Sequence, residues 1–312
     1  MENPTSDEKI LAALAHASII LMFLGPLGAV IIWAIQRTKS KYVRYHALQA
    51  MGYQTFSFWI WMFMMFFFMI ILFGFGAIIG VLSSKSPSAM PPDFLFFIQP
   101  LFMLVIFGMW GIIFLVGFIG AVFCGLGKEF RYPFIGSWLQ TKILNAPTEE
   151  EAEKWEDLWV ASICHTTAIL MMWGMIMPII VWFSQKDRSA RLKFQSMQAF
   201  LYQLIVTVAY FISYAGFFFV YVFGIAIFAA SGVMADPSQT TMPAGFEVGF
   251  IIIMAIFMLF WLAWMILYPA YLITAGVAAV RTLRGHDFKY PLLGKFLAKR
   301  MSPPESHEVI QA

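Results

Sequence analysis

The chain has 312 residues, of which 61% are hydrophobic, 18% aromatic and only 12% charged, and its formal net charge is +3. Soluble domains are about 45–50% apolar and about 25% charged, so this composition excludes a water-soluble fold, a secreted disulfide scaffold and a disordered chain. The small net charge gives no basic field suited to nucleic acid, and we expect a polytopic membrane protein.

The predicted spans are six long apolar segments, in chain order residues 10–36, 48–82, 95–126, 157–184, 198–232 and 248–280. Each is long enough for a helix to cross a hydrocarbon core of about 30 Å, which takes about 20 residues. Only helices and closed barrels satisfy the backbone in lipid, and the continuous apolar run at residues 62–68 lacks the alternation of a barrel strand. The predicted fold class is therefore an all-α integral membrane protein.

The first segment and its counterpart at residues 157–184 carry helix-breaking residues near their middles, namely Gly25, Pro26, Gly28, Gly174 and Pro178. Proline removes a backbone donor and clashes with the preceding turn. Each of these segments could be one kinked span or a broken re-entrant hairpin that returns to its starting side. With six single spans, the halves would be inverted repeats, as in many transporters.

The distribution of Lys and Arg favours the hairpins. Six single spans would place 12 basic residues on one face and 8 on the other, whereas two hairpins would place 19 on one face and 1 on the other. Cytoplasmic loops carry the excess of basic residues, so the hairpin topology puts both termini in the cytoplasm. We expect a multi-pass protein of the plasma (inner) membrane. The half-helices, of about 13–15 residues, would reach only about 20–22 Å.

The second half of the chain repeats the first. A shift of 149 residues pairs His16 with His165, Gly25 with Gly174, Trp33 with Trp182, Gln36 with Gln185, Ser40 with Ser189, and residues 49–50 and 53–54 with 198–199 and 202–203. A shift of 158 pairs residues 127–136 with 285–294, and the extra nine residues fall in the loop at 233–246. We predict two tandem helical repeats, residues 1–146 and 147–312, the second with a basic amphipathic tail.

The repeated motifs are Ala-His-x-Ser/Thr, Ile-x-Trp, a basic loop with Ser, Gln-Ala-x-x-Tyr-Gln and a closing Phe-Arg/Lys-Tyr-Pro. This arrangement resembles the Tic-twenty-like bacterial membrane proteins, also called domain of unknown function 4870, over about residues 8–144 and 157–300. The tandem form departs from the usual single copy. The resemblance implies a part in protein transport across membranes and no assigned reaction.

His16 and His165 are the ionisable pair within the apolar segments. Two imidazoles could bind a metal or relay a proton, but without a carboxylate or a paired cysteine they form a poor metal site. We expect each neutral ring to bond a carbonyl freed by its helix break. Cys124 and Cys164 are expected to be ordinary buried thiols, and we predict no metal and no cofactor.

Amide and phenol groups lie where the second long helix of each repeat enters the membrane: Gln49, Tyr53, Gln54, Gln198, Tyr202 and Gln203. Interhelical amide bonds hold such bundles together and contribute about 0.6–2 kcal/mol each, and this is the favoured interpretation. The alternative is a polar groove for a substrate.

The remaining candidates lie at the membrane interface. Arg44 and Lys193, in equivalent basic loops, are expected to meet anionic headgroups. Four tryptophans are expected in the aromatic belt, namely Trp33, Trp155, Trp159 and Trp182. Thr148 is predicted to cap a helix, and residues 291–301 form a predicted amphipathic helix in the interface plane.

Away from their ends, the apolar segments contain no Asp, Glu, Lys or Arg, which argues against an ion-coupled carrier or proton pump. No phosphate loop, zinc spacing or catalytic triad pattern is present, so an enzyme is not predicted. We predict a non-enzymatic scaffold or assembly/translocation factor that acts through helix–helix contacts. The alternative is a small-solute transporter with its site between the repeats. Expected partners are membrane lipids and either other membrane proteins or a second copy, without nucleic acid.

Overall fold

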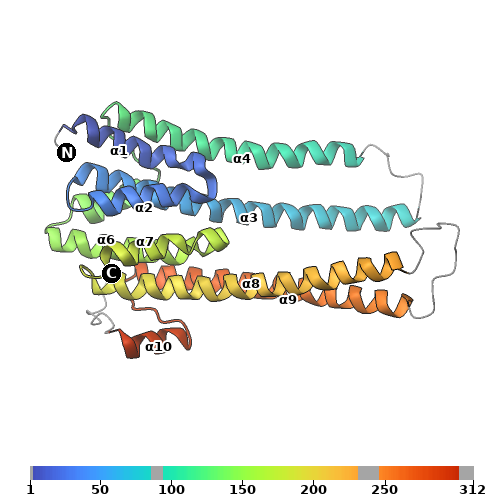
Figure 1. The fold of residues 1–312 in the computed structure, drawn as a ribbon. Coiled ribbons are helices and arrows are strands. Elements are labelled where there is room, and N and C mark those ends of the chain that lie inside the picture. Colours follow the sequence, from blue (N-terminus) through green and yellow to red (C-terminus); the bar gives the residue numbers. More distant parts are fainter. Residues whose placement is uncertain (1–2, 86–93, 231–245, 302–312) are drawn as a thin grey trace.

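The computed structural model describes residues 3–85, 94–230 and 246–301, which form helices and turns without any strand (Figure 1). The first repeat opens with a hairpin made of α1 (Ser6–Ala17), the turn η1 (Ser18–Leu24) and α2 (Gly25–Gln36). Met22 has a φ of 52°, a left-handed conformation at which the chain reverses. The Ser40 hydroxyl donates to Glu8 Oε1 over 2.5 Å, so both ends of the hairpin lie together.

The second repeat opens in the same way with α6 (Glu149–Thr166), η3 (Thr167–Trp173) and α7 (Ile176–Gln185). Met171 has a φ of 50°, and the Ser189 hydroxyl donates to Asp157 Oδ2 over 2.5 Å. Although residues 6–36 together are long enough to cross a membrane once, the reversal at Met22 divides them. Both segments are therefore hairpins, as the distribution of basic residues predicted.

Four long helices complete the membrane part: α3 (Lys41–Lys85), α4 (Phe94–Gly125), α8 (Ala190–Ala230) and α9 (Phe246–Leu283). Figure 1 shows them extending well past the hairpins, with the basic loops gathered at the opposite end. Within the described residues, five apolar stretches are long enough to span a membrane; the predicted segment 157–184 is not among them and contains only the short apolar helix α7. The all-α membrane fold with two helical repeats is confirmed.

Each repeat ends in a short helix that follows a residue of positive φ. In the first repeat these are α5 (Ile135–Leu139) and the π-helical turn η2 (Gln140–Leu144), and in the second α10 (Leu293–Arg300). Leu297 of α10 is buried while Phe296 is half exposed under the Arg300 guanidinium, 4.4 Å from its ring centre. An amphipathic helix is thus present where predicted.

A large hydrophobic core joins the two repeats at the basic end. Its fully buried members come from α1, α2, α3, α5, α6, α7 and α8, and they include Trp33, Leu48, Met51, Leu139, Ile163, Met177 and Val181. α2 packs against α7, and η2 packs against α6. The far halves of the long helices instead expose large apolar side chains such as Phe67 and Phe219, as expected for a lipid-facing surface.

Candidate functional site

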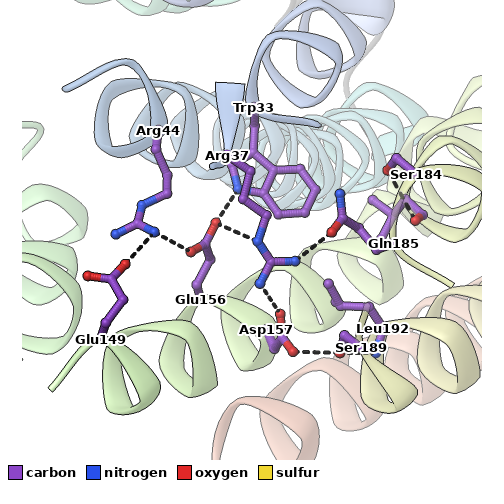
Figure 2. Close-up of polar contacts among 11 residues, drawn as sticks. Trp33, Arg37, Arg44, Glu149, Glu156, Asp157, Ser184, Gln185, Ser189 and Leu192 are labelled. Carbon is purple, nitrogen blue, oxygen red and sulfur yellow. Dashed lines mark hydrogen bonds and ion pairs between the residues drawn. The ribbon is translucent and has the colours of Figure 1, made fainter. Parts of the chain in front are cut away.

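A cluster of charged side chains lies between the repeats (Figure 2). We call it the inter-repeat cluster; it consists of Arg37, Lys41 and Arg44 from the first repeat and Glu149, Glu156 and Asp157 from the second. Arg37 Nη2 lies 2.6 Å from Asp157 Oδ1, and Arg44 Nη1 lies 2.8 Å from Glu149 Oε1. Three cations face three anions, so the cluster is formally neutral.

Glu156 is the centre of this cluster and has no solvent exposure. Its Oε1 accepts a 2.5 Å hydrogen bond from Trp33 Nε1 and lies 3.4 Å from Arg37 Nε, while Oε2 lies 3.6 Å from Arg44 Nη1. Arg37 and Arg44 are only 7% and 5% exposed. Buried charges of this kind are tolerated when they are paired, and removing one partner is strongly destabilising.

The edge of the inter-repeat cluster reaches solvent. Glu149 is about half exposed and binds both Lys41 and Arg44. Hydrogen bonds from these two cations hold the pKa of the Glu149 carboxyl below its usual range, so that it stays charged. Thr148 Oγ1 accepts a bond of 3.2 Å from Glu151 N, which confirms the predicted cap and fixes the start of α6.

Sequence reasoning did not select Arg37, Glu156 or Asp157. The signal that could have found them is the 149-residue shift, which pairs Glu156 and Asp157 with the acidic residues Asp7 and Glu8. Glu8 and Asp157 each accept from the equivalent serine hydroxyl, whereas Asp7 is exposed and Glu156 is buried between the repeats. At this position the two similar units therefore present unlike surfaces to each other.

The structure corrects three expectations at the membrane interface. Arg44 does not meet headgroups, because it is buried in ion pairs. Trp33 and Trp159 do not lie in an aromatic belt: Trp33 binds Glu156, and Trp159 Nε1 donates to Leu48 O over 3.2 Å. Lys193 is half-buried and has no ion-pair partner in the described ranges, so its headgroup contact remains a prediction.

The side-chain amides of Gln54 and Gln203 bind backbone carbonyl groups of the broken hairpins. Gln54 Nε2 donates to Ala15 O over 3.0 Å, and Gln203 Nε2 donates to Cys164 O over 2.8 Å. These carbonyls are equivalent in the two repeats and lie just before the turns η1 and η3. The amides thus satisfy backbone groups that the helix break leaves without an intrahelical partner.

Gln49 and Gln198 hold the segment that follows the last long helix of each repeat. Gln198 Nε2 donates to Phe288 O over 2.9 Å and its Oε1 accepts from Tyr290 N over 2.8 Å; Gln49 binds Phe130 O and Tyr132 N in the same way. The rings of Tyr53 and Tyr202 stack on those tyrosines with centroid distances of 4.0 and 3.9 Å. Each set stays within one repeat.

Replacing Gln54 by Leu is expected to lower the free energy of unfolding by about 1–3 kcal/mol, because Ala15 O and Ser18 Oγ lose a buried donor. Thermal unfolding of the full chain in detergent would measure this. The matched control is Gln99→Leu, at an exposed amide of α4, which should leave the midpoint unchanged. Equal loss in both variants would contradict the assigned role of Gln54.

His16 and His165 bond tyrosine hydroxyls and not the carbonyls expected from the sequence. The Nδ1 atoms lie 2.8 Å from Tyr132 Oη and 3.1 Å from Tyr290 Oη, respectively. The Nε2 atom of His165 contacts Gln195, whereas that of His16 contacts a second histidine, His46.

A thiol, that of Cys124, also lies beside His46 in the first repeat. These three side chains are the one group among the described residues that could hold a metal ion. Sequence spacing missed this group, because its members are far apart in the chain.

Comparison with known proteins gives one family. A family model described as the magnetosome magnetite crystal formation protein family, MamF/MmsF, matches residues 7–139 and 156–297. No curated protein and no solved structure matches the chain. The two matched ranges support the tandem repeat. They overturn the resemblance to the Tic-twenty-like family, for which no model matches, and with it the expectation of protein transport.

Proposed function

The chain belongs to the MamF/MmsF family of magnetosome magnetite crystal formation proteins, and we propose on this basis that it is a non-enzymatic scaffold of the magnetosome membrane. The inter-repeat cluster is the observation that carries the proposal. Its buried ion pairs join the two repeats into one body, while the long helices keep their far halves exposed to lipid. The joined ends of the two repeats form a rigid base, and the long helices extend from it with exposed apolar faces. Such an arrangement suits a protein that organises other membrane components through helix–helix contacts.

The free faces of the long helices support the same role. A Cβ atom built on Gly76, Gly80, Gly108 or Gly111 meets nothing within 4 Å. Small residues at membrane helix surfaces let another helix approach closely. These glycines of α3 and α4 are not used for packing inside the described part of the chain, so they remain available to a second copy or another membrane protein.

Two measurements test the scaffold role: identification of the proteins bound to the chain, and examination of the crystals formed by a deletion strain. Extraction of the chain from magnetosome membranes in lipid nanodiscs should yield a stoichiometric complex, either with itself or with another membrane protein. A deletion strain should form magnetite crystals of altered size or number, as seen by electron microscopy. A chain that is monomeric and without partners, together with normal crystals in the deletion strain, would contradict the proposal.

We also infer that both termini and all basic loops face the cytoplasm. Thr38→Cys and Asp187→Cys test this, because both positions are exposed and are related by the 149-residue shift. In isolated intact magnetosomes, whose outer face is the cytoplasmic one, an impermeant maleimide should label both cysteines. The native Cys124 and Cys164 are buried and can stay. Labelling of only one position from outside would contradict the hairpin topology.

The alternative of a small-solute transporter has no comparable support. The amides of Gln49, Gln54 and their counterparts already bind backbone groups of their own repeat. A cavity lined by Met171, Tyr210 and Trp264 is apolar, and the residues that line it all belong to the second repeat. A site between the repeats is therefore not favoured by these contacts.

A further inference from the structure

Three buried side chains from three helices converge near the basic end of the first repeat. They are His16 of α1, His46 of α3 and Cys124 of α4, and all three are fully buried. His46 Nδ1 lies 3.3 Å from His16 Nε2 and 3.3 Å from Cys124 Sγ, and all three donor atoms lie within 4.8 Å of one another. Each of these atoms carries a lone pair that can bind a metal.

The spacing of these atoms fits a tetrahedral metal centre. Zinc binds imidazole nitrogen at about 2.0–2.1 Å and thiolate sulfur at about 2.3 Å, which places neighbouring donors roughly 3.3–3.6 Å apart. The two measured separations of 3.3 Å lie at the lower end of that range. A single ion can therefore contact His46 together with each of the other two donors after small side-chain shifts.

The second repeat is an internal reference for these positions. The 149-residue shift places Gln195 opposite His46, and the 158-residue shift places Thr282 opposite Cys124. His165 keeps its tyrosine contact, with Nδ1 3.1 Å from Tyr290 Oη. The same fold is thus built without the second histidine or the thiol. A structural role in hydrogen bonding does not account for a histidine at position 46, because its buried Nε2 atom has no partner within the described residues.

We propose that His16 Nε2, His46 Nδ1 and Cys124 Sγ bind one thiophilic transition-metal ion of the Zn²⁺ class. Two imidazoles and one thiolate suit zinc and exclude Mg²⁺ and Ca²⁺, which prefer oxygen ligands. On binding, the Cys124 thiol releases its proton to solvent and both rings bind as neutral imidazoles. In this state the His16 Nδ1–H group donates a hydrogen bond to the Tyr132 hydroxyl oxygen. The other ring nitrogen, Nε2, is then unprotonated and free for the metal.

Cobalt is the probe, because Co²⁺ replaces Zn²⁺ and is coloured. The full chain, purified in detergent and freed of metal by a chelator, should bind one equivalent of Co²⁺ with a thiolate-to-cobalt charge-transfer band in the near ultraviolet. Added Zn²⁺ should abolish that band. His46→Gln and Cys124→Thr copy the second repeat, so both variants should fold. Loss of an outer-shell partner alone weakens metal binding roughly 10–100-fold, so loss of a ligand in either variant should weaken Co²⁺ binding by at least about 100-fold.

The matched control is Cys164→Ala, which changes the other buried cysteine to the residue at its counterpart, Ala15. It should bind Co²⁺ as the unaltered chain does. Circular dichroism and size-exclusion chromatography establish that each variant is folded. Failure of the folded unaltered chain to bind Co²⁺, or unchanged binding in His46→Gln and Cys124→Thr, would overturn the proposal.

Discussion

The substitution Glu156→Gln is expected to lower the free energy of unfolding by about 3–5 kcal/mol. Glutamine keeps the shape of the side chain and an oxygen that can accept from Trp33 Nε1, but it removes the charge that faces two buried guanidinium groups. Arg37 would retain Asp157, and Arg44 would retain the half-exposed Glu149. Unfolding of the full chain in detergent, followed by tryptophan fluorescence, measures the loss.

Two controls separate this effect from a general loss of charge. Asp7→Asn changes the repeat counterpart of Glu156, which is exposed, and should leave the unfolding midpoint where it was. Glu129→Gln breaks an ion pair with Arg131 in which both side chains are nearly half exposed, and should change stability by less than about 1 kcal/mol. A loss in either control as large as that in Glu156→Gln would contradict a special role for the buried carboxylate.

The membrane fold could be predicted from the sequence because its signals are local. Long apolar runs define the helices, and the count of basic residues distinguished a hairpin from a single span at residues 10–36 and 157–184. Lipid forces the backbone to be satisfied within each helix, so composition alone carries much of the information. The repeat was visible because equivalent residues recur in order at two shifts, 149 residues over the first part of each unit and 158 residues near its end.

The contacts between the repeats could not be predicted in this way. A repeat alignment shows that Asp7 and Glu156 are equivalent, but not that only one of them is covered by the other unit. Trp33 was assigned to the membrane interface because the sequence does not show that the second repeat covers it. In the structure it is buried against Glu156. Likewise, His46 and Cys124 are separated by 78 residues and belong to no spacing motif.

Gly52→Leu is the second substitution with a large expected effect. A Cβ atom at Gly52 of α3 would collide with Cζ2 of Trp159 from α6, so the repeats are in direct contact there. That indole cannot easily move, because its Nε1 donates to Leu48 O and its ring packs 5.1 Å from that of Trp138. Overpacking of this kind costs about 1–3 kcal/mol, and more where the neighbours are fixed.

Leucine is a fair test at this position because the second repeat carries Leu201 there. The helix itself therefore accepts the side chain, and a loss of stability reports on the interface. Gly74→Leu, on the same helix but facing open space, should leave the unfolding midpoint unchanged. A comparable loss at Gly74 would show that the helix, and not the contact with the second repeat, is at fault.

Combining Gly52→Leu with Glu156→Gln tests whether the indole contact and the inter-repeat cluster hold one interface together. Distant, independent sites give additive losses, whereas residues that share an interface do not. Once either change has separated the repeats, the other has less left to disrupt, so the double variant should lose less than the sum of the single losses. Strict additivity would instead mean that each contact stabilises its own repeat, and it would remove the rigid base on which the scaffold role depends.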